Sequence, residues 1–445
     1  MFEMSARARA IMAALSAAFL ATAACSGGKG GSSHAASVTQ PVKGGPIEAG
    51  VIPAKGTPSY NFLRDLANGL EKDYPGTKMT LTFANTEARP GLEQRWRSGK
   101  GPDLDYGMFD GTNPNLQDWA NDDFLVDLTP YLKQQNPQTG KPWLDSFSPT
   151  AQPFMKNKDG KYYAVPTEAS LTVLFYNAKI FKDHDIKPPA TWDELLTAVD
   201  QLKAAGVDPI AVTGLFEPYM GMWSDYLFLR SVGYAKTRAA LSDCTGKLDD
   251  PGFADGLTKL QQLRDKGAFL KGFQGTDFTA AQASFFQGKA GMILMGSWLV
   301  SEMKKSIPPD FQLGAIGFPS LPGGHGDQTA LMGGEQLVSL NAKSDVIPLA
   351  IEWLKRLTSK QTQTARAKEI GEVSAVNDVG APPEMPGMDK VMKSASTMVP
   401  RYYGIPDSKT KDAVYPEIAK LFFGKSDAQQ TLNNLKSNLS RVCGN

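Results

Sequence analysis

Apolar residues recur along the chain at two alternating spacings, which predict helices and strands in turn. In 60–74 they recur at helical spacing, and Pro75-Gly76 stands where that helix must end. The next segment, 78–83, alternates polar and apolar residues and predicts a strand. The same order continues with helices over 92–97 and 117–132 around a strand over 103–109. This β-α-β-α order predicts an α/β domain with a substantially parallel sheet.

A second series with the same order follows. The segment 163–176 is rich in β-branched and aromatic residues and predicts a strand. Thr191 stands three residues before Glu194, the spacing of a capping box at a helix start. Further helices are expected over 221–232, 253–266 and 280–286, with strands over 210–212 and 290–295. Two α/β series therefore share one chain, and the remaining residues must attach to one or both.

The N-terminal segment has the pattern of a secretory signal. Residues 1–24 combine two arginines with an apolar run that is too short to span a bilayer. The run ends at Cys25 in a pattern that resembles a bacterial lipobox, although Thr22 stands where leucine is usual. An ordinary cleavage site at small residues is the alternative. The Gly/Ser-rich segment that follows predicts a flexible tether. We therefore expect an exported protein, lipidated at Cys25 and anchored at the outer face of the cell membrane.

Composition and charge exclude two classes. Of 445 residues, 41% are hydrophobic and 21% are charged, which excludes disorder over the whole length. The chain carries 47 Lys and Arg against 46 Asp and Glu, and the body after the signal segment is formally neutral. Nucleic-acid binding depends on a surplus of positive charge, so we expect no nucleic-acid partner.

Three cysteines are present, and lipidation of Cys25 would leave an even number in an oxidising compartment. A disulfide between Cys244 and Cys443 is therefore predicted.

Motifs of catalysis and of metal binding are missing. The sequence has no H-E-x-x-H zinc motif, no G-x-S-x-G elbow and no phosphate-binding loop. We predict no catalytic residue, no cofactor and no metal. Carboxylates are plentiful, so a surface-anchored glycoside hydrolase or lyase stays open as an alternative function.

Several short segments resemble a known family in the family's own order. They are Gly101-Pro102-Asp103 with 105–109, 163–169 continuing to 174–177, 188–195, and 285–292 continuing to Gly296-Ser297-Trp298. Together they resemble the extracellular solute-binding proteins of carbohydrate ABC importers, the maltose-binding-protein-like group called family 1. The similarity runs from about residue 51 to the C-terminus.

The resemblance implies an α/β fold of the periplasmic-binding-protein-like type II class, with two discontinuous lobes joined by a hinge. After the signal (1–24) and the tether (25–44), the expected N-terminal lobe comprises 45–164 and 300–335. The expected C-terminal lobe comprises 165–299 and 336–445. The resemblance further implies a monomeric receptor, not an enzyme, that captures a mono- or oligosaccharide between the lobes. It would deliver that ligand to ABC permease subunits in the membrane. The same fold binding a polar non-sugar such as a glycerophosphodiester is the in-family alternative.

The resemblance and the expected strand ends together give a set of candidate ligand contacts. Carboxylates and amides bind sugar hydroxyls, and aromatic rings cover the apolar faces of sugar rings. Trp298 matches the family's stacking tryptophan, and Glu168 matches the acid on its first crossing strand. The full set of candidates is Trp298, Asp110, Glu168, Glu217, Tyr219, Trp223, Glu335, Tyr402, Asn85 and Glu87.

Overall fold

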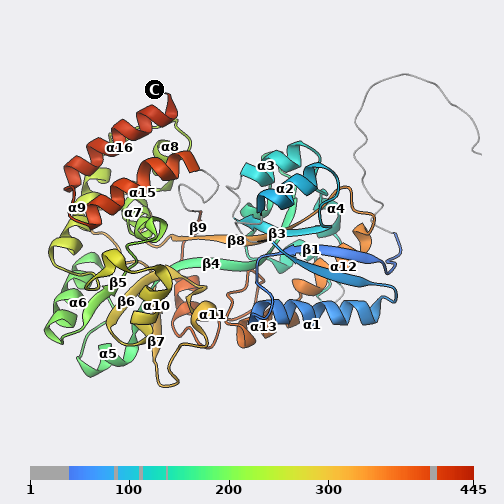
Figure 1. Cartoon of the computed structure of the whole chain (residues 1–445), viewed down its shortest axis with the longest axis horizontal. Helices are drawn as coiled ribbons and strands as arrows, with labels where there is room; N and C mark the ends of the chain where they lie inside the picture. The colour runs from blue at the N-terminus through green and yellow to red at the C-terminus, as the bar shows by residue number, and fades with distance from the viewer. Residues whose placement is uncertain (1–39, 85–88, 110–113, 137–138, 401–407, 445) are drawn as a thin grey trace, which may run out of the picture. The chain divides into compact units, whose positions relative to one another are not determined.

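Helices and strands alternate along most of the chain, as the apolar pattern predicts (Figure 1). The structure is a computed structural model that describes residues 40–84, 89–109, 114–136, 139–400 and 408–444. The predicted signal segment and Cys25 lie outside the described residues, as do the candidates Asn85, Glu87, Asp110 and Tyr402. Among the helices that the structure does describe, none is both long enough and apolar enough to cross a membrane.

The strands are β1 (Pro46–Val51), β2 (Lys78–Phe83), β3 (Leu104–Phe109), β4 (Ala164–Asn177), β5 (Asp208–Ala211), β6 (Ala290–Gly296), β7 (Leu313–Ile316), β8 (Leu331–Leu340) and β9 (Met398–Val399). The helices up to β6 are α1 (Pro58–Asp73), α2 (Arg89–Arg97), α3 (Pro114–Asn121), α4 (Thr129–Leu132), α5 (Ala178–Asp183), α6 (Trp192–Ala204), α7 (Glu217–Ser231), α8 (Tyr234–Leu241), α9 (Pro251–Asp265) and α10 (Phe278–Phe286). The later helices are α11 (Leu299–Met303), α12 (Ile347–Leu357), α13 (Lys360–Glu369), α14 (Met388–Ser394), α15 (Ser408–Phe422) and α16 (Ala428–Cys443). Short 3-10 helices cover Trp143–Ser146, Gln152–Met155 and Phe273–Gly275.

Local signals in the sequence place several helix ends. The backbone N–H of Glu194 donates to Thr191 Oγ1 at 3.3 Å, and the Thr191 N–H donates to the Glu194 carboxylate at 3.1 Å. This reciprocal pair is the predicted capping box, and it begins α6. The prediction of one helix over 117–132 is wrong. The chain leaves α3 at Asn121, Asp123 adopts a left-handed φ of 57°, and α4 begins only at Thr129.

The sheet is mixed, which corrects the prediction of a substantially parallel one. In the described residues it has nine strands, in the order β2-β1-β3-β8-β4-β6-β5, with β7 paired to β4 and β9 to β8. Parallel pairing holds for β1 with β2 and β3, for β5 with β6, and for β8 with β9. The pairs β3–β8, β4–β8, β4–β6 and β4–β7 are antiparallel.

Two long strands, β4 and β8, connect the two series of elements. They pair with each other from Ala164 opposite Ser339 to Thr172 opposite Met332. Toward its C-terminal end β4 pairs with β6 and β7, whereas β8 pairs with β3 along its other edge, from Gln336 to Leu340. Figure 1 shows both strands running between the elements around β3 and those around β6. We call β4 and β8 the crossing strands.

The hydrophobic core divides into clusters on the two sides of the crossing strands. One large cluster gathers apolar residues of β6, α6, α7, α9, α15 and α16. A second gathers those of β1, α1 and α12, and a smaller third one includes the stacked pair Trp96 and Trp119. The predicted lobe boundaries differ from this grouping. Leu313 and Leu331 pack in the first cluster, whereas Val338 and Leu354 pack in the second. The segment around Leu313 and Leu331 therefore packs with the elements of the predicted C-terminal lobe, and the segment from Val338 to Leu354 packs with those of the predicted N-terminal lobe.

A disulfide joins the two cysteines that the cysteine count pairs. Cys244 follows α8, Cys443 ends α16, and their Cα atoms lie 5.5 Å apart. The bond links positions separated by 199 residues and holds α16 against the α8 end of the large cluster.

Thiol titration of the Cys25→Ser variant of the whole chain tests this bond. We expect no reactive thiol in the denatured, unreduced protein and two after reduction, because only Cys244 and Cys443 then remain. Two reactive thiols before reduction would contradict the pairing.

Candidate functional site

Hydrogen bonds connect the loop that follows β5 to the loop that precedes α10. Gly214 N and Leu215 N both donate to the carbonyl oxygen of Thr276, at 3.1 and 3.3 Å. The Thr213 hydroxyl donates to the same oxygen at 2.9 Å. Because this single carbonyl holds both loops, Phe216 at the start of α7 comes to lie beside Phe278 at the start of α10.

Four aromatic rings from three helix starts gather at this point. We call Phe216, Tyr219, Phe278 and Trp298 the aromatic platform. Ring centroids are 4.9 Å apart for Phe216–Tyr219, 5.9 Å for Tyr219–Phe278 and 6.3 Å for Tyr219–Trp298. Phe216 and Phe278 are 41% and 38% exposed, and they are among the few large apolar side chains on the surface of the described residues. A contiguous apolar patch of this kind commonly marks a binding site.

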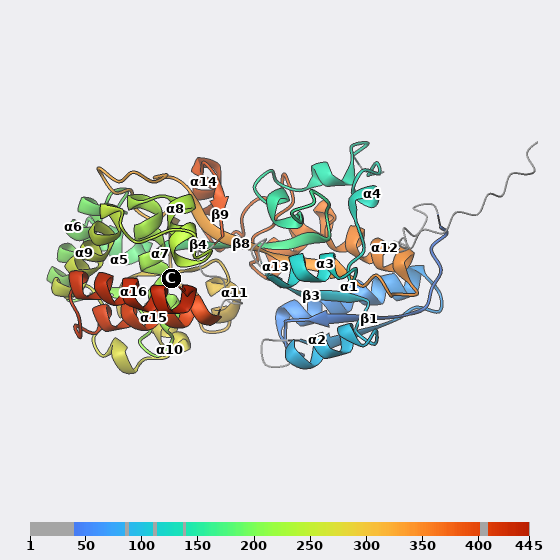
Figure 2. The same cartoon turned by 90° about the horizontal axis from the view of Figure 1, so that it is seen from above.

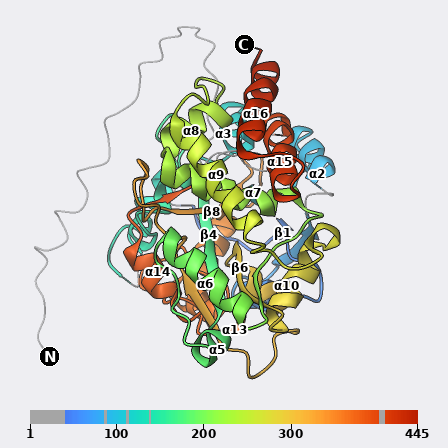
Figure 3. The ribbon, with the colours of Figure 1, turned by 90° about the vertical axis from the view of Figure 1, so that its left-hand side faces the viewer.

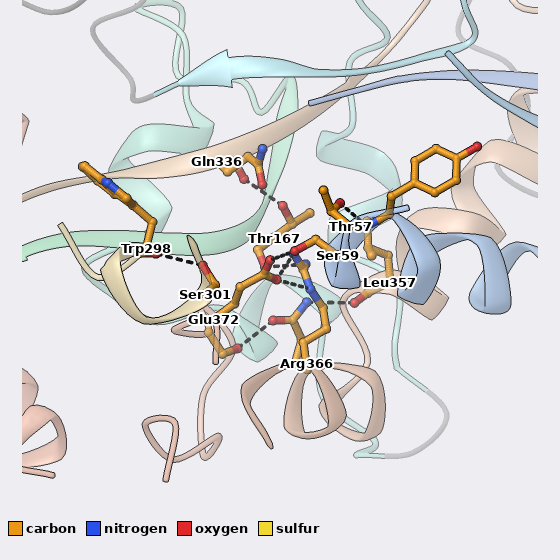
Figure 4. Close-up of polar contacts among 12 residues, drawn as sticks. Thr57, Ser59, Thr167, Trp298, Ser301, Gln336, Leu357, Arg366 and Glu372 are labelled. Carbon is orange, nitrogen blue, oxygen red and sulfur yellow. Dashed lines mark hydrogen bonds and ion pairs between the residues drawn. The ribbon is translucent and has the colours of Figure 1, made fainter. Parts of the chain in front are cut away.

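The turn after β6 holds Trp298 against β4. The Ser297 hydroxyl donates to the Ala169 carbonyl at 3.2 Å and accepts from the Leu171 N–H at 3.2 Å. A Cβ at Gly296 would lie 2.1 Å from the Trp298 ring, so only glycine lets the indole fold back at this position. The Ser301 hydroxyl, one turn along α11, donates to the Trp298 carbonyl at 3.0 Å (Figure 4).

A carboxylate stands at the edge of the platform. Glu217 is the first residue of α7 and is exposed. In the sequence it stands between the platform residues Phe216 and Tyr219. Desolvation and the nearby Asp412 carboxylate raise its pKa, and Lys411 opposes them. The platform therefore combines apolar faces with an acceptor for hydroxyl or amide donors.

A charged network lies under the crossing strands (Figure 4). Arg366 on α13 donates from Nε to Glu372 at 2.8 Å and from Nη1 to the Thr167 carbonyl at 2.8 Å. Glu372 also accepts from the Ser59 hydroxyl at 2.8 Å. Glu168 lies next to this group on β4. Burial and the Glu372 carboxylate raise the pKa of Glu168, Arg366 opposes them, and Glu302 on α11 adds to the rise.

The structure brings some of the predicted site residues together and separates others. Trp298, Tyr219 and Glu217 meet at the platform, and Glu168 lies on β4 with Glu302 of α11 acting on it. The prediction for Trp223 does not fit its position, because this ring is 1% exposed and packs edge-on against Phe269 and Phe318 in the core.

Glu335 also lies apart from the platform. It is 1% exposed and lines a separate cavity beside the crossing strands, to which none of the four platform rings contributes.

Sequence reasoning missed Phe216 and Phe278. Phe216 immediately precedes α7, which begins with Glu217. Phe278 is the first residue of α10 and follows the N-cap residue Asp277. A large apolar residue at a helix start, outside the helix's apolar stripe, is the signal that would have indicated them. Their meeting depends on the Thr276 carbonyl, which no local pattern reveals.

The chain matches the sequence model of a known protein family. The model of the bacterial extracellular solute-binding proteins matches residues 54–364, most of the chain. The chain belongs to this family. The platform residues Phe216, Tyr219, Phe278 and Trp298 of this solute-binding protein all lie inside the matched region.

Curated relatives of this solute-binding protein are similar over about two thirds of its length. The multiple sugar-binding protein of Streptococcus mutans is 25% identical over 312 residues, which are 69% of this chain and 69% of the relative. A probable sugar-binding periplasmic protein of Rhizobium meliloti is 26% identical over 302 residues, 66% of this chain and 67% of the relative.

Solved structures share the fold of this solute-binding protein. A chitin oligosaccharide binding protein superposes with a TM-score of 0.73 at 23% identity, covering 89% of this chain and 99% of its own. The raffinose complex of the solute-binding protein RafE gives a TM-score of 0.68 at 21% identity, covering 89% and 99%. These likenesses confirm the predicted α/β fold of the periplasmic-binding-protein-like type II class.

Proposed function

We propose that this solute-binding protein is a receptor that binds a mono- or oligosaccharide at the aromatic platform and delivers it to the permease of an ABC importer. The observation that carries the proposal is the cluster of partly exposed rings with a carboxylate at its edge. Sugar rings have apolar faces and hydroxyl edges, so they match rings that offer flat apolar area and carboxylates that accept hydrogen bonds. The names of the relatives as sugar-binding proteins support the same ligand class.

Capture on the platform would be reversible. The platform lies on elements of the large core cluster, next to the crossing strands. The other series of elements also has an exposed aromatic ring, because Phe83 at the end of β2 is 44% exposed. We propose that a bound sugar is enclosed between the two series, and that the permease recognises the enclosed form. Export, lipidation at Cys25 and a monomeric state complete the proposal.

The rival function is a surface-anchored glycoside hydrolase or lyase. Such an enzyme needs two carboxyl groups at a fixed separation on either side of the scissile bond. Glu217 borders the platform, but the relatives are binding proteins rather than enzymes, which favours a receptor.

A thermal-shift screen across neutral mono- and oligosaccharides, followed by calorimetry and product analysis, tests the proposal. A ligand that binds only the folded chain raises its melting temperature in a saturable way. We expect one binding event per chain and unchanged sugar after prolonged incubation. Shortened oligosaccharides would identify the hydrolase, and no shift with any saccharide would contradict sugar binding.

A further inference from the structure

A cavity lies against the crossing strands, on the side away from the aromatic platform. Its volume is about 560 Å³, within the range of small-molecule sites. Residues of β4 and β8 form its floor, and α14 lines one wall. Figures 2 and 3 show α14 and α10 on opposite sides of the crossing strands, and α10 begins with the platform residue Phe278. The cavity and the platform are therefore separate places on the chain.

Register fixes which side chains face this cavity. Ala169 pairs with Glu335, and Leu171 pairs with Gly333. Paired residues share a face of the sheet, so Glu335 projects on the same side as Ala169 and Leu171, which also line the cavity. Ser148 and Thr150, residues of the segment 374–380 after α13, and Met398 of β9 close it from the other sides.

Glu335 is a buried carboxyl group without a partner. It is 1% exposed, and neither of its oxygens has a hydrogen-bond partner in the described part of the chain. Burial and the Glu168 carboxylate raise the pKa of Glu335 well above its ordinary value. A buried polar group left unpaired destabilises the folded chain, and an unpaired charge does so more strongly. Such a group, directed into a cavity, is positioned to pair with something that enters it.

The lining of the cavity has more acidic than basic side chains. Among the described residues that line it, Glu335, Asp378 and Asp389 carry carboxyl groups, and Lys393 carries the opposing ammonium. Asp389 already accepts from the Ala381 N–H at 2.8 Å, whereas Asp378 is exposed on the loop after α13. Leucine, valine, alanine and methionine side chains line the cavity beside the polar side chains of Ser148, Thr150, Ser374, Asn377 and Thr397. This lining suits a cation that carries an apolar carbon skeleton.

We propose that the cavity is a second ligand site, which binds a small organic amine whose ammonium group pairs with Glu335. Pairing would replace the missing hydrogen-bond donors of the carboxyl group, while the carbon skeleton covers Leu171, Leu331 and Met398. The site is independent of the sugar platform and takes a ligand of different charge.

Amine binding at this site is linked to the proton on Glu335. Because the raised pKa favours the protonated carboxyl group, an ammonium ion must displace that proton, so affinity rises with pH. Several charged groups face this carboxyl group or act on its neighbour. They are Glu168 on β4, the Arg366–Glu372 pair that acts on Glu168, Asp378 after α13, and Asp389 and Lys393 on α14.

Calorimetry on the whole chain with cyclohexylamine and with cyclohexanol, its neutral counterpart of similar shape, tests the proposal. We expect saturable one-to-one binding of the amine only, tighter by about tenfold or more at pH 8.5 than at pH 6.5, with proton release. Absence of saturable amine binding at millimolar concentrations, or equal binding of the alcohol, would overturn the site.

Variants separate this site from the platform. Glu335→Gln keeps the shape of the protonated side chain, so it should fold as stably as the parent and yet weaken amine binding about tenfold or more. Lys393→Gln removes the opposing charge and should tighten amine binding. Trp298→Ala should leave amine binding unchanged, so a failure of the sugar site does not affect this test. Unchanged amine affinity in Glu335→Gln would contradict the proposal.

Discussion

Replacing Trp298 with alanine is expected to weaken carbohydrate binding by about 100-fold, which corresponds to ~2.7 kcal/mol. The indole is partly buried, lies 6.3 Å from Tyr219 between ring centroids, and sits at the end of the platform nearest the crossing strands. Truncation removes the largest flat apolar face from the platform and leaves the sugar face exposed to water. Calorimetric titration with the best saccharide from the screen measures the loss.

Two variants separate ligand contact from general damage to the fold. Trp298→Phe retains a ring and should lose much less affinity than the alanine variant. Tyr234→Ala removes a partly buried ring of α8, outside the platform, and should bind as the parent does. If Trp298→Ala keeps the parent's affinity while its melting temperature is unchanged, Trp298 does not contact the ligand.

Replacing Arg366 with alanine is expected to lower the free energy of unfolding by about 3–5 kcal/mol. Its ion pair with Glu372 is buried, with side-chain exposures of 6% and 8%, and the shortest N–O distance is 2.5 Å. Removing the guanidinium leaves Glu372 as a buried charge without its partner and also removes the donor to the Thr167 carbonyl. Urea unfolding, monitored by circular dichroism, gives the difference.

An exposed ion pair on a neighbouring helix is the matched control. Arg356 on α12 pairs with Asp73 at 2.7 Å, with side-chain exposures of 27% and 54%. Pairs of this kind contribute about 0–1 kcal/mol, so Arg356→Ala should change stability far less. The double variant Arg366→Ala with Glu372→Ala should recover part of the loss, because no buried carboxylate then stays unpaired. Equal losses in the two arginine variants would refute the role of the buried pair.

Elements with a local signal could be predicted closely from the sequence. The strand expected over 78–83 is β2, and the capping box of Thr191 and Glu194 begins α6 as expected. The strand expected over 163–176 is β4, with ends shifted by one residue. In each case the signal lies within a few residues of the element itself, where periodicity and capping act.

Pairing between distant segments could not be predicted in the same way. The antiparallel contact of β8 with both β3 and β4 joins residues more than a hundred positions apart, and no local pattern encodes it. The grouping of 313–331 and 338–354 with the core clusters depends on that pairing. The predicted lobe boundaries therefore differed where the chain crosses a second time.

The tryptophans show the same limit at the candidate site. Trp223 and Trp298 are both candidate ligand contacts from the sequence, but Trp223 lies in the middle of α7 whereas Trp298 precedes α11. Nearly every side chain of α7 from Met220 onward is buried, so Trp223 faces protein on all sides. Trp298 instead leaves β6 at a turn. The exposure of each tryptophan therefore depends on the elements packed around it, which the residue type does not indicate.

The second crossing has a consequence for how such a chain can be divided or recombined. The cluster around β1 and α1 is completed by α12, which follows β8, whereas the large cluster is completed by α15 and α16, which follow α12. Each cluster is therefore built from two separate stretches of the chain. No single cut in the gene would release either half with its whole core. An exchange of one half between relatives would need three crossovers, one in each crossing strand and one after α13, because α15 and α16 return to the large cluster. Circular permutation would not bring either half into one continuous segment, because the two halves alternate along the chain.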